Sequence, residues 1–418
     1  MVLSLPATAM GFALSVQIAA LSWILNTKFG FNLKEIGFVW LAGPAAGILG
    51  QVIIGLVSDN VWFWGGRRRP FILIGGIIAS VMLLALPNIG VISEALGFEE
   101  VIGVAIAVAL SLDLAINISF NPTRSVIADV TPKGTVRTKG YTWMQTISGF
   151  FGVLAYLIGA VISNYVLIYF GAILVFLFSV IPTLFITEPR NLQPEGEIIE
   201  TDQSNQKTNL PEFLKICIAH AFTWVGVQTM FIYTFSYIKE NIMGFNTTDQ
   251  LAEAQDNEIG LITGIAFAVL NTVGFLLPSL VLEPLTEKIG RVKTHMLCIA
   301  IMSIGYLMII FFGQSEWSLY SLMVIVGIGW AAVVSLPFAI MSETVNQSKM
   351  GLFMGLFNLS VVLPQLVASS LGGFIDQAEN KSMIFIISAI ALGVSAILWL
   401  FVKENKSSQQ PLNTSSSH

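Results

Sequence analysis

The chain has 418 residues, of which 55% are hydrophobic and 11% are charged, and its formal net charge is −5. Soluble domains carry about 25% charged residues, so a water-soluble fold of this size would lack the polar surface to cover itself. The composition therefore excludes an ordinary soluble domain, and the sequence lacks the clustered basic face of a nucleic-acid-binding protein.

Twelve apolar segments are long enough to cross a bilayer, which takes about 20 helical residues. They lie at residues 5–27, 36–57, 70–90, 101–129, 140–162, 164–187, 212–238, 258–282, 294–313, 318–342, 350–372 and 382–402. Backbone groups in lipid must be hydrogen-bonded within their own segment, so each is predicted to be a helix. The first segment has no basic start and no cleavage site, and we interpret it as a spanning helix rather than a signal peptide.

The longest polar interruption runs over residues 188–209 and is rich in Pro, Gln, Glu and Asn, which predicts a solvated linker. It divides the chain into six-helix halves at residues 1–187 and 210–403, followed by a tail at 404–418 that we expect to be disordered. The predicted fold class is an all-α membrane protein with twelve transmembrane helices in two six-helix pseudo-repeats. Halves joined in this way are typical of the major facilitator fold, with substrate bound between them.

Both halves contain a short pattern of carboxylates and basic residues after their second and fourth helices. The pattern comprises Asp59, Arg67, Arg68, Arg69 and Asp129 in the first half and Glu287, Arg291 and Glu343 in the second. We interpret it as an internal repeat and as a cytoplasmic gate held by charge-assisted hydrogen bonds. The alternative is that these are solvated surface charges.

The distribution of Lys and Arg predicts the orientation of the helices. With both termini on one side, fifteen of these residues fall in loops and tail on that side and four on the other, with Arg124 inside a helix. We therefore expect a multi-pass integral membrane protein with both termini in the cytoplasm, monomeric and in the inner (plasma) membrane of a bacterium.

The fourth segment contains a polar stripe inside the membrane. Arg124 is eleven residues after Asp113, which returns it to within about 20° of the same helix face and roughly 16 Å along the axis. Asn117, one turn after Asp113, shares that face. Ionisable groups inside a membrane are costly and usually functional, so this stripe is expected to face the bundle interior.

These residues and others resemble the sucrose–proton symporter family, which comprises plant sucrose transporters and bacterial and animal glycoside-transporting relatives. The fourth helix matches the family pattern at Asp113, Asn117, Pro122, Arg124, Ala128 and Asp129. The second helix matches it at Trp40, Leu41, Gly43, Pro44, Gly47, Gln51, Gly55, Ser58 and Asp59, followed by the family's basic motif at Gly66–Phe71. The second half matches it at Pro337–Ala339, Met354, Gly355, Asn358, Pro364 and Gln365.

The resemblance implies that Asp113 is the proton-coupling carboxylate and that Arg124 is needed for sugar transport. Desolvation favours the neutral form of a carboxyl group and a nearby guanidinium favours the charged form, so alternate opening of the site could switch Asp113 between them. The alternative is a structural Asp–Arg pair that braces the helix.

Sugar recognition requires hydrogen-bonding groups for hydroxyls and flat apolar faces. Candidate substrate-binding residues, besides Arg124, are Gln17, Gln51, Asn117, Trp224, Gln228, Tyr233, Asn358 and Gln365. Each could instead join helices to one another. The seventh helix departs from the plant pattern because Tyr233 begins a neutral stretch where the family has acidic residues, and His220 on that helix is expected to be packed rather than a proton relay.

We therefore expect a secondary active transporter that imports a disaccharide or related glycoside, sucrose- or maltose-like, with a proton by alternating access. The alternatives are an exporter of sugars or small molecules on the same fold, or a membrane enzyme or sensor. No nucleotide-binding loop or metal-ligand spacing occurs in the sequence, so no enzyme, cofactor or metal is expected. Sodium in place of the proton stays open.

Overall fold

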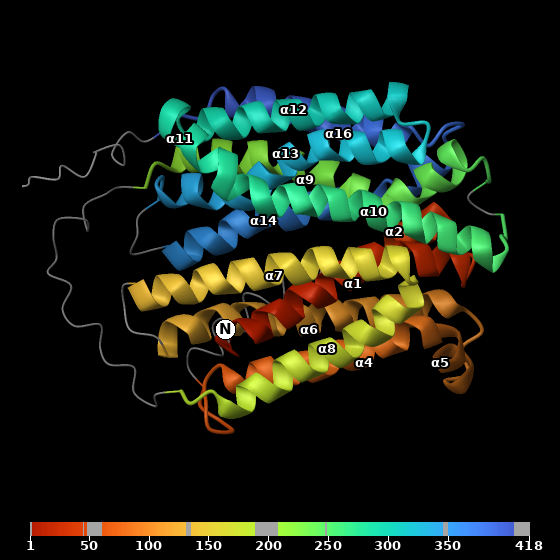
Figure 1. Ribbon diagram of the computed structural model, residues 1–418, viewed down its shortest axis with the longest axis horizontal. Helices are drawn as coiled ribbons and strands as arrows, with labels where there is room; N and C mark the ends of the chain where they lie inside the picture. Colours follow the sequence, from red (N-terminus) through yellow and green to blue (C-terminus); the bar gives the residue numbers. More distant parts are fainter. Residues whose placement is uncertain are drawn as a thin grey trace, which may run out of the picture.

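The computed structural model describes residues 2–44, 46–47, 61–130, 135–188, 208–246, 249–345 and 350–404. The described residues are almost entirely helical, and an isolated bridge between Phe63 and Gly66 is the β-type pairing found among them. Most of the helices run along the long axis of the molecule in two groups, one from each half of the chain (Figure 1).

The described part of the first half is built from long helices. Its elements are η1 (Val2–Ser4), α1 (Leu5–Thr27), α2 (Leu33–Trp40), α4 (Arg69–Ala85), η2 (Leu86–Asn88), α5 (Ile89–Ala95), α6 (Val101–Val130), α7 (Thr135–Val161) and α8 (Asn164–Phe185). Local signals set several starts: Asn32 caps α2 by accepting from the Glu35 N–H, and Ser163 caps α8. The second predicted span, 36–57, continues from α2, and most of its remainder lies outside the described residues.

The second half mirrors the first in its succession of spans. Its elements are α9 (Leu210–Tyr237), η4 (Ile238–Ile242), α10 (Glu253–Leu277), η5 (Pro278–Leu282), α11 (Glu283–Ile289), α12 (Arg291–Phe312), α13 (Glu316–Ser342), α14 (Met350–Ser370), α15 (Gly372–Asp376) and α16 (Met383–Trp399). Both η4 and η5 are single π-helical turns at the end of a longer helix.

Nine helices in the described part of the chain are long and apolar enough to cross a membrane. Thr146–Val161 and Met383–Trp399 are shorter apolar helices, and α2 begins a further span. Together these are consistent with twelve spans. Large apolar side chains such as Phe176, Phe185 and Phe311 are exposed on the outside of the bundle, as lipid contact requires.

The loops gather at two ends of the bundle. The end that carries Glu188 and Thr208, which flank the linker, is here the linker end, and the opposite end is the far end. The far end comprises the loops at residues 28–32, 96–100, 162–163, 243–246, 249–252, 313–315 and 377–382. In Figure 1, α11 lies at the linker end and α5 at the far end.

The two halves contact each other along several helices. Helix α7 packs against α10, and α2 packs against α14 and α15. At the far end this approach is so close that a Cβ on Gly37 would collide with the backbone oxygen of Ser369, and one on Gly372 with that of Leu33. Glycine therefore lets the backbones of α2 and of the α14–α15 segment meet at the far end.

Candidate functional site

Asp113 lies near the middle of α6 and is only 8% exposed. Its Oδ2 accepts a hydrogen bond of 2.9 Å from Nε2 of Gln17, which lies near the middle of α1. The carboxylate also faces Gly43, where an added Cβ would come within 3.1 Å of Oδ2. The sequence-predicted residues Gln17 and Asp113 are thus brought together at mid-depth of the bundle.

Gln17 has unused hydrogen-bonding capacity. Its side chain is 1% exposed, and its Oε1 has no hydrogen-bond partner among the described residues. A buried acceptor without a partner is costly, so it marks a place where a hydroxyl donor would be favoured. Asn117 differs in this respect, because its Nδ2 donates to the backbone oxygen of Asp113 at 2.8 Å.

Arg124 lies towards the linker end of the same helix and its side chain is exposed. Its guanidinium carbon is 4.3 Å from the centre of the Phe120 ring, a cation–π arrangement. The carboxylate of Asp113 is hydrogen-bonded to Gln17 rather than to Arg124. The two ionisable residues therefore lie at different depths of one helix and contact different residues, Gln17 and Phe120.

Three of the predicted residues of the second half form a polar and aromatic surface on α9 and α14. Nε1 of Trp224 donates to Nε2 of His220 at 2.9 Å, and Nε2 of Gln365 donates to Oε1 of Gln228 at 3.3 Å. Trp224 is half-buried, so part of the ring stays accessible. The ring of His220 stacks on Phe357, as the expectation of packing for this residue implies.

Trp330 and Asn271 join this surface, although the sequence analysis did not select them. Trp330 on α13 is half-buried, packs edge-on against Trp224 and Phe231, and donates to Oδ1 of Asn271 on α10 at 3.2 Å. Asn271 could have been predicted from the sequence, because it is an amide side chain inside an apolar span. Trp330, like Trp224, lies in an apolar run, where the sequence does not show whether a tryptophan ring faces a site or the core.

The other predicted substrate-binding residues have different surroundings. Tyr233 is fully buried near the far end, and its hydroxyl donates to the backbone oxygen of Ser369 at 2.8 Å, which favours the helix-packing alternative. Asn358 is half-buried on α14. Gln51 lies outside the described residues.

Two clusters of the predicted gate residues can be described, one in each half. The backbone N–H groups of Arg67, Arg68 and Arg69 all donate to the carboxylate of Glu188, at distances from 2.7 to 3.0 Å. Glu188 was predicted only as the first residue of the linker. Its contact with the basic motif could not be predicted from the sequence, because 119 to 121 residues separate the two.

In the second half, Arg291 pairs with Glu343, while its backbone N–H donates to Glu404 at 2.6 Å. Glu287 is exposed on α11. Asp59 lies outside the described residues, and of Asp129 only its place on α6 is described.

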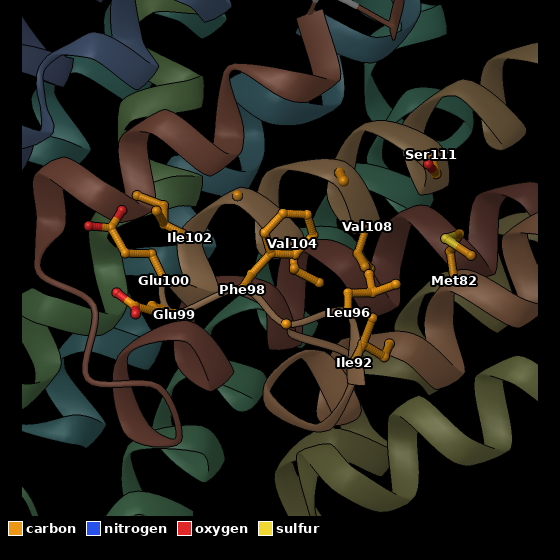
Figure 2. Close-up of a pocket in the computed structure, with 13 residues that line it drawn as sticks. Met82, Ile92, Leu96, Phe98, Glu99, Glu100, Ile102, Val104, Val108 and Ser111 are labelled. Atoms are coloured by element: carbon orange, nitrogen blue, oxygen red, sulfur yellow. The ribbon is translucent and has the colours of Figure 1, made fainter. Parts of the chain in front are cut away.

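A large pocket of about 840 Å³ lies elsewhere on α6 (Figure 2). It runs from Glu99 and Glu100 along apolar side chains of α5 and α6 to Ser111. Ser111 is two residues from Asp113, or about 200° around the helix, so the pocket and the carboxylate lie on different faces. Its apolar lining is unsuited to a sugar.

Comparison with known proteins places this geometry in a family. The model of the Major Facilitator Superfamily matches residues 3–359 and 250–417. Sucrose transport protein SUT5 from Oryza sativa subsp. indica is 25% identical over 453 residues, covering 92% of this chain and 84% of that protein. The general alpha-glucoside permease of Schizosaccharomyces pombe is 29% identical over 262 residues, covering 54% of this chain and 47% of the permease.

Solved structures of transporters share the fold. The nucleoside transporter NupG superimposes with a TM-score of 0.70 at 12% identity, covering 96% of each chain. The inward-open xylose transporter XylE from E. coli gives 0.69 at 15% identity, covering 97% of this chain and 96% of XylE. These likenesses, the helical architecture and the family match agree, and the chain is a multi-pass membrane transporter that belongs to the Major Facilitator Superfamily.

Proposed function

We propose that this transporter imports a disaccharide or related glycoside together with a proton by alternating access. The observation that carries the proposal is the buried pair of Gln17 and Asp113, a carboxylate in the middle of the bundle beside an amide oxygen that has no partner among the described residues. A proton-binding group and a free acceptor for a hydroxyl are thus held side by side.

The class of substrate is supported by the side chains of the candidate surface and by the similarity to known transporters. The half-buried rings of Trp224 and Trp330 offer flat apolar faces, and the amides of Gln228, Gln365 and Asn271 offer donors and acceptors. Sugars present the complementary hydroxyls and apolar ring faces. Two relatives are named for sucrose and for alpha-glucosides, which makes these the first substrates to test.

Asp113 has the features needed of a proton carrier. Its hydrogen-bond partner is a neutral amide, and burying an ionised carboxylate without a cation is costly. In this mechanism the residue is protonated while it is sealed from water and releases the proton when the site is hydrated. The proton and the sugar would then cross in one conformational cycle.

The basic loops support an orientation with the linker end in the cytoplasm. Described residues such as Arg67, Arg69, Lys215 and Arg291 lie at that end. Cytoplasmic loops of membrane proteins carry an excess of Lys and Arg. With the far end sealed between α2 and α14, the described conformation fits a state that opens towards the cytoplasm.

Uptake into proteoliposomes tests the proposal. We expect labelled sucrose or maltose to accumulate when the outside is more acidic than the lumen, and not when the gradient is collapsed by a protonophore. A panel of glucose, xylose and a nucleoside serves to define specificity. Accumulation that ignores the pH gradient, or that needs a gradient of opposite sign, would contradict proton-coupled import and favour a facilitator or an exporter.

A further inference from the structure

Lys239 is a cation buried at the contact between the two halves. It lies in the π-helical turn η4 at the far end of α9 and is 1% exposed. Its Nζ donates to Oδ1 of Asn26 on α1 at 3.0 Å and to the backbone oxygen of Asp249 at 2.9 Å. We propose that Lys239 and Asn26 form a lock that holds the far end closed during the transport cycle. The proposal rests on the alternating-access mechanism above.

The position of Lys239 is unusual for a lysine near a membrane surface. Such a side chain normally extends to water or to the lipid headgroups. Here it points into the contact between α1 and α9, with the carboxylates of Asp249, Asp256 and Glu240 near enough to act on it electrostatically. Single π-helical turns are frequent at functional sites, and this one carries the lysine that donates to Asn26.

The side chain of Asn26 is oriented by a second hydrogen bond. It is 5% exposed, and its Nδ2 donates to the backbone oxygen of Phe31 at 2.9 Å, which leaves Oδ1 facing Lys239. One turn earlier on α1, Nε1 of Trp23 donates across the halves to the backbone oxygen of Asp256 at 2.8 Å. The far end of α1 is therefore joined to the second half by two neighbouring hydrogen bonds.

The stability of the lock depends on the acceptor that Asn26 provides for Lys239. Closing the far end removes the ammonium of Lys239 from water, and that cost is offset only when its hydrogen bonds are made. Removing Asn26 leaves the buried ammonium with one acceptor fewer, whereas replacing both partners by apolar groups can be neutral or favourable. Loss of Asn26 alone should thus open the far end, and simultaneous loss of Lys239 should close it again.

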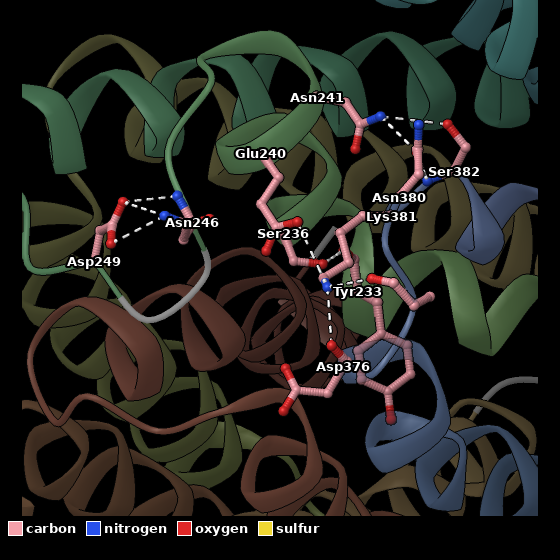
Figure 3. A network of polar contacts seen from close by, with 11 residues as sticks. Tyr233, Ser236, Glu240, Asn241, Asn246, Asp249, Asp376, Asn380, Lys381 and Ser382 are labelled. Carbon is pink, nitrogen blue, oxygen red and sulfur yellow. Dashed lines mark hydrogen bonds and ion pairs between the residues drawn. The ribbon is translucent and has the colours of Figure 1, made fainter.

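Lys381 provides a matched control at the same end (Figure 3). It is 4% exposed and lies 3.5 Å from the carboxylate of Glu240, and its Nζ donates to the backbone oxygens of Asp376 and Ala378 at 3.1 Å. All of these contacts stay within the second half. A general effect of removing a buried lysine from the far end would appear at Lys381 as well as at Lys239.

The experiment measures opening through a cysteine placed in the sealed contact. Ser369 is 1% exposed and lies against Gly37 of the other half, so we would introduce S369C after replacing Cys217 and Cys298 by alanine. The rate at which a bulky, hydrophilic maleimide labels the purified protein in detergent reports the opening of the far end. This readout needs neither sugar nor a proton gradient, so it is independent of the test of the proposed function.

Two substitutions of Asn26 separate the lock from local damage. Both N26L and N26D lose the hydrogen bond to Phe31, but only N26D keeps an acceptor for Lys239. We expect N26L to raise the labelling rate about tenfold or more and N26D to lower it. The double variant N26L/K239M should return to within about twofold of the parent, and K381M should stay within the same range.

Three results would overturn the lock. The first is labelling of N26L at the parental rate. The second is an equal rise in N26L and N26D, which would assign the effect to the contact with Phe31. The third is a rise in K381M as large as that in N26L, which would indicate general loosening of the far end.

Discussion

At the scale of single residues, the fourth helix could be interpreted from sequence because a charged group in an apolar span stands out. Asp113 was predicted for that reason and Gln17 as a polar group for sugar hydroxyls, and the structure joins the two by a hydrogen bond of 2.9 Å. Trp330 was not among the candidates, although Trp224 on a similar apolar run was, because the sequence of such a run does not show which ring faces a site and which lies in the core. The partnership of Lys239 was equally hidden, since its position in sequence implied an ordinary residue near an outer loop.

Trp330 is expected to contribute an apolar face to sugar binding. Replacing it by leucine should raise the KM for the transported sugar by about tenfold with a smaller effect on the maximal rate, since aromatic contacts of this kind are worth roughly 1 kcal/mol beyond buried area. The W330F variant keeps an aromatic ring, so its KM should lie between those of the parent protein and W330L. Initial uptake rates over a range of sugar concentrations measure both parameters.

Trp317 on the same helix is the control for this prediction. It is 73% exposed on the outside of α13, so W317L should leave the KM unchanged. An unchanged KM in W330L would remove this residue from the site.

At the scale of helices, the hydrophobic spans predicted most of the elements and missed their interruptions. The third span is divided by η2 at Leu86–Asn88, and the seventh and eighth end in π-helical turns at Ile238–Ile242 and Pro278–Leu282. Hydropathy measures burial in lipid and does not report where the hydrogen-bond register of a helix changes. In η4 that change positions Lys239, so the missed detail has a functional consequence.

The close approach of α2 and the α14–α15 segment predicts a strict requirement for glycine. G37A and G372A should each reduce the rate of uptake by about tenfold or more, because a Cβ at either position collides with the backbone of the other half and works against closure of the far end. Proteoliposome uptake at saturating sugar measures the effect.

G355A on α14 is the matched control, because a Cβ at that position has open space around it. The variant should fold and insert into the membrane like the parent protein, and it should take up sugar at the same rate. Normal uptake by G372A would show that the halves need not approach so closely in the cycle.

At the scale of the whole molecule, composition, span lengths and charge bias were sufficient to predict a helical membrane transporter, and the family match confirms that prediction. The pairing of the halves could not be predicted, because it depends on small contacts such as Gly37 against Ser369 and Trp23 against Asp256. Such contacts join residues more than 200 positions apart. They hold the two halves together at the far end of the bundle.

The central claim is that Asp113 carries the proton that accompanies the sugar. The most direct measurement is the pH of the proteoliposome lumen, followed with a trapped dye when sugar is added outside without an imposed gradient. Sugar should acidify the lumen with the parent protein, and D113N should abolish acidification while sugar exchange across the membrane persists. Acidification by D113N at the parental rate would contradict the claim.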